Sequence, residues 1–294
     1  MKRVLLTGAT GFVGSRLVQA YKNCWQLDAP NREQLDLTNR AQIHEYVTQS
    51  MPELVIHTAA ISNTQYCEAH PLDSFLLNVQ LPERLAKECE AIGAKLVFFS
   101  SDQVYNGTRT AGPLPEDALL APITVYGRHK LQAEQRVLEL CPDAVCLRAT
   151  WMYDFERPNL KNNTGFWGNL QAVLQQKQTL QLAVREHRGI TWVMQVVQAM
   201  EQMTQLPGGV YNMGARNPLN TYATGLMCLE RMGAEESAMA LLQPDTERWP
   251  QFERNLSMDT DKLKRACGVD FGDTVDSFAA CLTAWNKEKG GTEL

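Results

Sequence analysis

Three glycines near the N-terminus, Gly8, Gly11 and Gly14, constrain the fold of this chain more than any other feature. They follow a short apolar segment, residues 2–7, that is predicted to be a buried strand, and they precede an apolar-periodic segment that opens with Ser15. A glycine turn between a strand and a helix lets a pyrophosphate approach the backbone and face the free N–H groups of the helix. The position of the motif therefore predicts a dinucleotide-binding unit, although its first step is one residue longer than in the G-x-G-x-x-G form.

Length and composition narrow the class of protein. The chain has 294 residues, enough for one large α/β domain with a smaller lobe, and its 28 basic and 33 acidic residues leave no basic field for nucleic acid. No run approaches the roughly 18 apolar residues of a membrane-spanning helix, and the N-terminal strand lacks a signal-peptide cleavage pattern. The eight cysteines form no C-x-x-C pair and the five histidines show no ligand spacing. We expect a cytoplasmic protein with no metal site, no membrane partner and no nucleic-acid partner.

Strands and helices alternate along the first half of the chain. Apolar segments at 25–29, 52–57 and 95–99 are predicted strands, and they alternate with predicted helices over 39–50 and 71–91. This rhythm is typical of a Rossmann-type, doubly wound parallel sheet in an α/β protein. Ligands of such sheets bind beyond the carboxyl ends of the strands.

The second half is predicted to form a smaller C-terminal substrate lobe. We expect the NAD(P)-binding unit to occupy residues 1–150, with later segments returning to it, and the lobe to occupy mainly residues 151–294. The elements expected in this half are helices over 166–177, 221–232 and 273–287 and strands over 180–184 and 210–213.

The end of the second predicted strand bears on the choice between NAD and NADP. An acidic residue here accepts the ribose hydroxyls of NAD, whereas an arginine can hold the 2′-phosphate of NADP. The chain carries Asn31 followed by Arg32, so we favour NADP over NAD. The alternative is that Arg32 is a solvated loop charge and that Asp28 or Glu33 serves NAD.

Tyr126 and Lys130 begin the predicted helix that runs to about residue 140. Residues four apart lie on one face of a helix, so the ammonium can sit near the phenol and lower its pKa from about 10. A tyrosine tuned in this way exchanges a proton near neutral pH. The Tyr-x-x-x-Lys spacing is common by itself, but Ser100 and Ser101 at the end of the fourth strand make this a predicted catalytic centre.

These residues resemble those of the extended short-chain dehydrogenase/reductases, and within them the dTDP-4-dehydrorhamnose reductase group. The motifs that carry the resemblance are Thr7-Gly-Ala-Thr-Gly-Phe-Val-Gly14, Leu35-Asp-Leu-Thr38, His57-Thr-Ala-Ala60, the stretch from Leu96 to Gly107, Val125-Tyr-Gly-Arg-His-Lys130, and the stretch from Leu147 to Tyr153. Together they cover about half of the chain.

The resemblance implies roles for individual residues. Ser101, Tyr126 and Lys130 would form the catalytic trio, and Trp151 would pack against a sugar nucleotide. The residues predicted to bind the cofactor are Gly8, Thr10, Gly11, Phe12, Val13, Gly14, Asn31, Arg32, Asp36, Leu37, His57, Ala59, Ala60, Asn78, Ser100, Tyr126 and Lys130. Those predicted to contact the substrate are Ser101, Asp102, Gln103, Tyr126, Trp151, Asn169 and Arg188. Arg185, Arg188 and Arg248 are candidates to grip a nucleotide diphosphate.

The implied activity is reduction of a keto group on a nucleotide-linked sugar by NADPH. The resemblance is also compatible with a homodimer. The chain departs from the family pattern at Ser101, usually a threonine, and at Gln103, usually an aromatic residue. Related 4,6-dehydratases carry a second carboxylate where Gln103 stands, which argues against dehydration. Two alternatives stay open, a nucleotide-sugar epimerase that retains NAD and a non-catalytic subunit like the regulatory β subunit of methionine adenosyltransferase.

Overall fold

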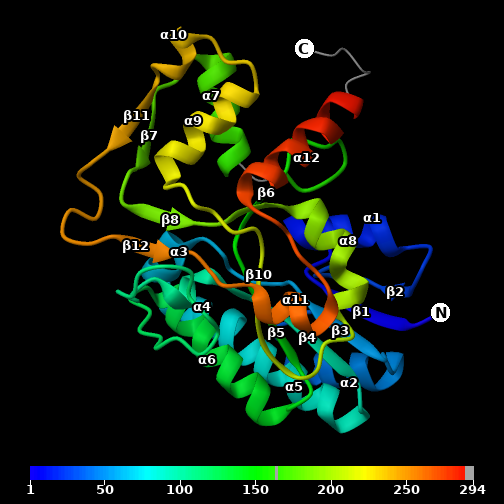
Figure 1. Ribbon diagram of the computed structural model, residues 1–294. Helices are drawn as coiled ribbons and strands as arrows, with labels where there is room; N and C mark the ends of the chain where they lie inside the picture. Colours follow the sequence, from blue (N-terminus) through cyan, green and yellow to red (C-terminus); the bar gives the residue numbers. More distant parts are fainter. Residues whose placement is uncertain (163–164, 289–294) are drawn as a thin grey trace.

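A six-stranded parallel sheet forms the centre of the protein (Figure 1), as predicted from the alternation of strands and helices. The computed structural model describes residues 1–162 and 165–288. The strands lie in the order β10-β5-β4-β3-β1-β2. Their bounds are β1 Arg3–Thr7, β2 Gln26–Asp28, β3 Leu54–His57, β4 Lys95–Ser101, β5 Val145–Ala149 and β10 Gly209–Met213. The carboxyl ends of β1, β3 and β4, where predicted site motifs lie, are therefore at one edge of the sheet.

Helices cover both faces of this sheet because successive strand residues point to opposite sides. In β1, Val4 and Leu6 pack in one core with α1, α8 and α11, whereas Leu5 packs in the other with α2, α5 and α6. The helices are α1 Phe12–Tyr21, α2 Arg40–Ser50, α5 Leu81–Ile92, α6 Val125–Leu140, α8 Val193–Met203 and α11 Asp261–Cys267. Among the described residues, no helix has the length and apolar character needed to cross a bilayer.

The segment predicted as one helix over 71–91 is divided into three. α3 Thr64–Ala69 precedes α4 Pro71–Phe75, a single π-helical turn η1 Leu76–Gln80 and then α5. Pro82 lies in the first turn of α5, where its missing N–H has no partner to lose. The π-helical turn η1 thus interrupts the α-helical hydrogen-bond pattern just before the proline, and it contains the buried Asn78.

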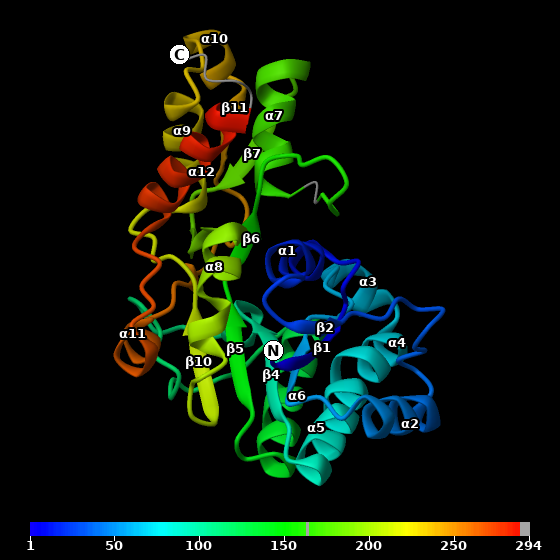
Figure 2. The same ribbon diagram turned by 90° about the vertical axis from the view of Figure 1, so that its right-hand side faces the viewer.

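A second core lies beyond the carboxyl edge of the sheet, where Figures 1 and 2 show α7, α9 and α12 gathered at one end of the molecule. Its aromatic centre includes Tyr153, Phe166, Trp167 and Phe278. Three parallel strand pairs connect it to the sheet: β6 Trp151–Tyr153 with β9 Ile190–Trp192, β7 Leu180–Ala183 with β11 Leu242–Asp245, and β8 Glu186–Arg188 with β12 Arg254–Leu256. Its helices are α7 Phe166–Gln176, α9 Thr221–Arg231, α10 Glu236–Met239 and α12 Thr274–Glu288.

A buried ion pair joins the two cores. The guanidinium of Arg16 in α1 donates to the carboxylate of Asp154, just after β6, over 2.8 Å, and both side chains are fully buried. Trp192 Nε1 donates to the other Asp154 oxygen at 2.8 Å. Arg16 Nη1 also donates to the carbonyls of Phe12 and Lys161. One guanidinium therefore ties the helix after the glycine turn to the loop that follows β6.

We expect Asp154→Ala to lower the free energy of unfolding by about 3–5 kcal/mol, because it leaves the buried Arg16 guanidinium without its carboxylate. Chemical denaturation followed by tryptophan fluorescence measures the change. Glu53→Ala, which removes an exposed partner of Arg3 at 3.6 Å, is the matched control and is expected to have a far smaller effect. Equal losses in the two variants would contradict a stabilising role for the buried pair.

Candidate functional site

The glycine turn brings the backbone of β1, α1 and β3 into close contact. Gly8 has φ +78°, and a Cβ there would lie 2.6 Å from the backbone nitrogen of Ala59. A Cβ on Gly14 would collide with the carbonyl oxygen of Gly8. Gly11 precedes α1 in extended conformation, and no side chain caps this N-terminus. The first N–H groups of α1 therefore remain available to an anion.

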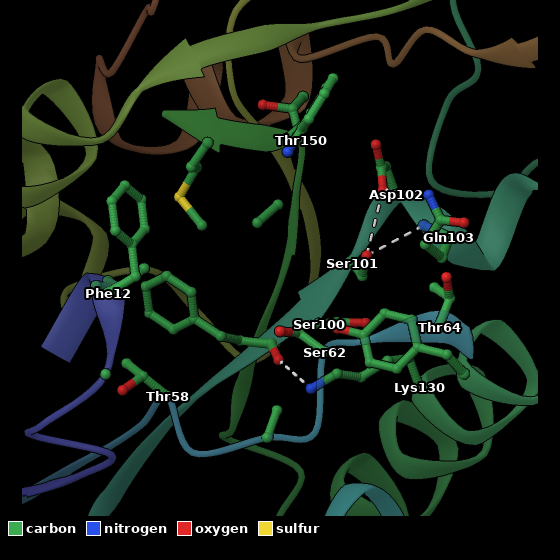
Figure 3. Close-up of a pocket in the computed structure, with 18 of the residues that line it drawn as sticks. Phe12, Thr58, Ser62, Thr64, Ser100, Ser101, Asp102, Gln103, Lys130 and Thr150 are labelled. Atoms are coloured by element: carbon green, nitrogen blue, oxygen red, sulfur yellow. Dashed lines mark hydrogen bonds between the residues drawn. The ribbon is translucent and has the colours of Figure 1, made fainter. Parts of the chain in front are cut away.

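A cavity of about 680 Å³ opens beside this turn at the carboxyl edge of the sheet (Figure 3). This size falls within the usual range of small-molecule sites, roughly 300–1,000 Å³. The predicted site residues that line it are Gly11, Phe12, Val13, Ala60, Ser100, Ser101, Asp102, Gln103, Tyr126, Lys130, Trp151 and Arg188. The structure thus brings the glycine turn, the serines of β4 and the Tyr-x-x-x-Lys residues to one cavity.

Ser101, Tyr126 and Lys130 meet because α6 begins beside the end of β4. The side chain of Thr124 caps α6 by accepting from the N–H of Gly127 at 3.1 Å. Tyr126 and Lys130 follow on the same helical face, and both are buried. The ammonium of Lys130 donates to the carbonyl of Phe99 at 2.8 Å, a bond visible in Figure 3.

The expected lowering of the tyrosine pKa is wrong for this structure. Burial raises the pKa of Tyr126 above its usual value, the Ser101 hydroxyl opposes the shift, and the negative charge of Asp102 adds to it. Lys130 lies 5.8 Å from the centre of the tyrosine ring, with its ammonium directed at the Phe99 carbonyl. Burial lowers the pKa of Lys130 to about 8. The phenol is therefore held in its protonated, proton-donating form.

The far end of the cavity carries two arginine pairs. Asp102 accepts from Arg188 at 2.7 Å and also from Ser101 and the Gln103 amide at 3.2 and 3.1 Å. Arg254 donates to Gln103 Oε1 at 2.9 Å and pairs with Glu186. Both carboxylate oxygens of Asp102 thus accept hydrogen bonds, and this residue positions its neighbours.

The aromatic ring of Trp151 packs against Arg188 at this end of the cavity. The guanidinium of Arg188 lies over the ring of Trp151 at 4.9 Å from its centre, and Trp151 lines the cavity. Asn169 of α7 is half-buried and does not line the cavity, and Arg185 and Arg248 are exposed, away from its lining. Of the three arginines considered as diphosphate ligands, the structure places Arg188 alone at the cavity.

Other predicted cofactor residues lie around the cavity without lining it. Gly8, Thr10, Gly14 and Ala59 belong to the turn and its β3 neighbour, and Asp36 and Leu37 follow the loop after β2. Asp36 is exposed and accepts from the N–H and hydroxyl of Thr38, which lowers the pKa of its carboxyl.

His57 and Asn78 are buried behind the cavity, where they hold the backbone. His57 Nδ1 is bonded to Thr7 Oγ1 at 2.6 Å, and burial, with help from the charge of Lys130, lowers its pKa to about 3. Asn78 accepts from the N–H of Ile61 and donates to its carbonyl, both at 3.0 Å. Asn78 therefore holds the backbone of Ile61 in the loop after β3, whereas His57 links β3 to the Thr7 hydroxyl of β1.

Asn31 and Arg32 form an exposed turn after β2. Asn31 Oδ1 accepts from the backbone N–H groups of Glu33 and Gln34. Asp28, the alternative ribose ligand, accepts from the phenol of Tyr46 at 2.7 Å. Arg32 makes no ion pair with any described residue, so its guanidinium is free to meet a phosphate.

The structure adds cavity residues that the sequence analysis missed: Thr58, Ser62, Thr64, Phe99, Ala149, Thr150, Met152, Lys161, Asn162 and Arg254. Five of these residues lie within motifs that carry the family resemblance and so had a signal: Thr58, Phe99, Ala149, Thr150 and Met152. Arg254 had none, because its approach to the cavity depends on the pairing of β12 with β8.

The fold and site define a Rossmann-type protein of the extended short-chain dehydrogenase/reductase class. The family model "RmlD substrate binding domain" matches residues 1–284, and the chain belongs to this family. A dTDP-4-dehydrorhamnose reductase from Bacillus anthracis, solved in complex with NADP, has the same fold, with a TM-score of 0.83, 19% identity and coverage of 97% of this chain and 100% of that one.

Curated relatives show higher local identity. Methionine adenosyltransferase 2 subunit beta from Xenopus tropicalis is 35% identical over 160 residues, which is 52% of this chain and 47% of that protein. A dTDP-4-dehydrorhamnose reductase from Streptomyces griseus is 34% identical over 159 residues, 53% of this chain and 52% of that protein. The chain thus spans about half the length of these relatives.

Gly14→Ala tests the close contact at the glycine turn. We expect the added methyl group to push α1 away from Gly8, weakening NADPH binding at least roughly tenfold and lowering the free energy of unfolding by about 1–3 kcal/mol. Fluorescence titration and chemical denaturation measure the two effects. Gly93→Ala is the control for cofactor binding: a Cβ there meets nothing within 4 Å, and its φ of +69° makes alanine strained, so this variant should lose stability but keep its NADPH affinity. Unchanged NADPH affinity in folded Gly14→Ala would contradict the role of the turn.

Proposed function

We propose that this protein is an NADPH-dependent reductase of a keto group on a nucleotide-linked sugar. The observation that carries the proposal is the convergence of Ser101, Tyr126 and Lys130 on a cavity that begins at the uncapped N-terminus of α1. Family membership supports it. We also propose that residues 1–150, with the later sheet segments, bind the nucleotide cofactor, and that the lobe beyond residue 150 mainly binds the sugar nucleotide.

The residues around the glycine turn fit a dinucleotide. The backbone contacts at Gly8 and Gly14 leave no room for side chains, and the free N–H groups of α1 face the cavity end formed by Gly11, Phe12 and Val13. This is the arrangement in which a helix N-terminus binds a pyrophosphate. NADPH, when bound, supplies the hydride that reduces the carbonyl carbon.

The side chains of the site complete the reduction. Tyr126 donates its proton to the substrate oxygen as negative charge develops there, and its raised pKa keeps that proton available. Ser101 would redirect its single hydroxyl proton from Asp102, 3.2 Å away, to the same oxygen. Lys130, fixed by the Phe99 carbonyl, holds the cofactor ribose and presents a positive charge beside the phenol.

Two features support a nucleotide-sugar substrate. Trp151 offers an aromatic face, and Arg188 and Arg254 bring guanidinium groups to the same end of the cavity, where planar donors suit phosphate oxygens. Gln103, in place of a carboxylate, leaves no second acid for dehydration. The site therefore favours reduction of a ketone already present in the substrate.

Arg32 supports NADPH over NADH. Its guanidinium is exposed beside the end of β2, while the carboxylate of Asp28 is engaged with Tyr46. A free guanidinium near the ribose attracts a 2′-phosphate.

A second candidate function is favoured by the identity with methionine adenosyltransferase 2 subunit beta. In this role the chain would bind the dinucleotide structurally and act on a partner enzyme. Titration of the purified protein with NADPH, followed by addition of keto-sugar nucleotides, separates the two. Consumption of NADPH supports the reductase, and binding without consumption across the panel supports the subunit.

Tyr126→Phe is expected to reduce turnover of the keto-sugar nucleotide by roughly 10²–10⁴ while NADPH binding persists, because only the proton donor is removed. Stopped-flow and steady-state absorbance of NADPH measure the rate. Tyr66→Phe, on exposed α3, is the matched control and should keep normal turnover. Near-normal turnover in Tyr126→Phe would exclude Tyr126 as the acid.

Arg32→Ala is expected to weaken NADPH binding roughly tenfold and to leave NADH binding unchanged, because the 2′-phosphate alone loses a partner. Calorimetric titrations with both cofactors provide the comparison. Lys22→Ala, an exposed cation at the other end of α1, serves as control. Equal losses of affinity for NADPH and NADH would show that Arg32 does not bind the 2′-phosphate.

A further inference from the structure

Glu134 is a buried carboxylate on α6, one turn beyond Lys130. Its side chain is 2% exposed. Ser100 Oγ donates to one carboxylate oxygen at 2.5 Å, and the Arg148 guanidinium donates to both oxygens at 2.8–3.2 Å. These bonds fix the carboxylate in one orientation.

The position of Arg148 is itself fixed by hydrogen bonds to Tyr105 and, through it, to Asn212. Its Nη1 donates to the phenol oxygen of Tyr105 at 2.6 Å, and that hydroxyl donates to Asn212 Oδ1 at 2.9 Å. Although burial opposes its charge, bonding to Glu134 raises the pKa of Arg148 above its usual value, and burial raises the pKa of Tyr105 to about 12. Arg148 therefore stays charged, and Tyr105 stays neutral, throughout the physiological pH range.

Lys130 and Glu134 form hydrogen bonds with consecutive residues of strand β4. The ammonium bonds to the carbonyl of Phe99, and the carboxylate bonds to the hydroxyl of Ser100. Residues four apart on a helix have Cβ atoms about 5–6 Å apart. Strand β4 thus holds the two opposite charges at neighbouring positions along the base of the cavity.

Few charges face Lys130 from the surrounding elements. His57 of β3 is neutral because burial lowers its pKa to about 3, and burial raises the pKa of the Cys146 thiol of β5 well above its usual range. The Cys67 thiol faces Lys130 from α3, and Tyr126 lies on the same helix. The carboxylate of Glu134 is the charge that opposes the desolvation of the ammonium and raises the pKa of Lys130.

We propose that Glu134 is a positioning residue of the site, whose carboxylate keeps the Lys130 ammonium charged and fixed against β4 so that it can hold the cofactor ribose. The inference rests on the proposed function of Lys130 as a cofactor ligand. Glu134 does not line the cavity, so it acts on the site through Lys130 and through Ser100, whose hydroxyl donates to it.

The test is the pH dependence of NADPH affinity, measured by nicotinamide fluorescence on the full chain without any sugar substrate. In the unmodified protein, affinity is expected to be present below pH 8 and to fall as the pH rises through about 8, where Lys130 loses its proton. Glu134→Gln is expected to move this fall to lower pH by about 1 unit or more. Glu139→Gln, exposed on the same helix, should leave it in place.

Glu134→Gln leaves the Arg148 charge unpaired, so a second variant, Glu134→Gln with Arg148→Met, removes both charges of the pair. In this variant Lys130 loses the negative charge of Glu134 and the positive charge of Arg148 together, so a smaller acid shift than in Glu134→Gln is expected. An unshifted fall in folded Glu134→Gln would overturn the role of Glu134.

Lys130→Met separates this inference from the proposed function. The fall near pH 8 should disappear in that variant, which would identify Lys130 as its origin. If the fall persists in Lys130→Met, it does not arise from Lys130 and the inference about Glu134 fails, while the proposed reductase function is still decided by NADPH consumption. If it disappears there while Glu134→Gln leaves it unshifted, the inference about Glu134 alone is wrong.

Discussion

The packing of α6 against the last residues of β4 is the constraint on which the site depends. β4 ends with Phe99, Ser100 and Ser101, and α6 places a polar side chain on each turn of the face that meets them. Lys130 bonds to Phe99 and Glu134 to Ser100. Because each contact uses a different residue of the strand, the helix cannot slide or rotate without breaking all of them.

The cavity also needs the smaller lobe. The sheet contributes the glycine turn and the polar residues at its carboxyl edge, whereas Trp151, Arg188 and Arg254 come from β6, β8 and β12. The buried Arg16–Asp154 pair joins the two cores beside the turn. A fully buried pair of this kind permits only small changes of geometry, since separating it would leave a charge without a partner. The cofactor end and the substrate end are therefore held in one arrangement.

Burial has opposite effects on the pKa values of Tyr126 and Lys130. It raises the pKa of Tyr126 and lowers that of Lys130, because in each case the neutral form is preferred where water is excluded. The helical spacing of the two residues suggested that the ammonium would dominate, and in the structure desolvation dominates instead. The carboxylates of Asp102 and Glu134 are paired with Arg188 and Arg148.

Local sequence determined the half of the molecule around the glycine turn. Gly8 and Gly14 stand where a Cβ would collide with backbone, apolar runs define strands covered on both faces, and a four-residue spacing places Tyr126 and Lys130 on one helical face. The tertiary structure alone decided what lies opposite these residues. Arg254 reaches the cavity through a strand pairing across 68 residues, from Glu186 to Arg254, and Arg16 meets Asp154 across 138. Such contacts, and the burial that sets the pKa values, arise from packing between distant segments, which residue spacing along the chain does not encode.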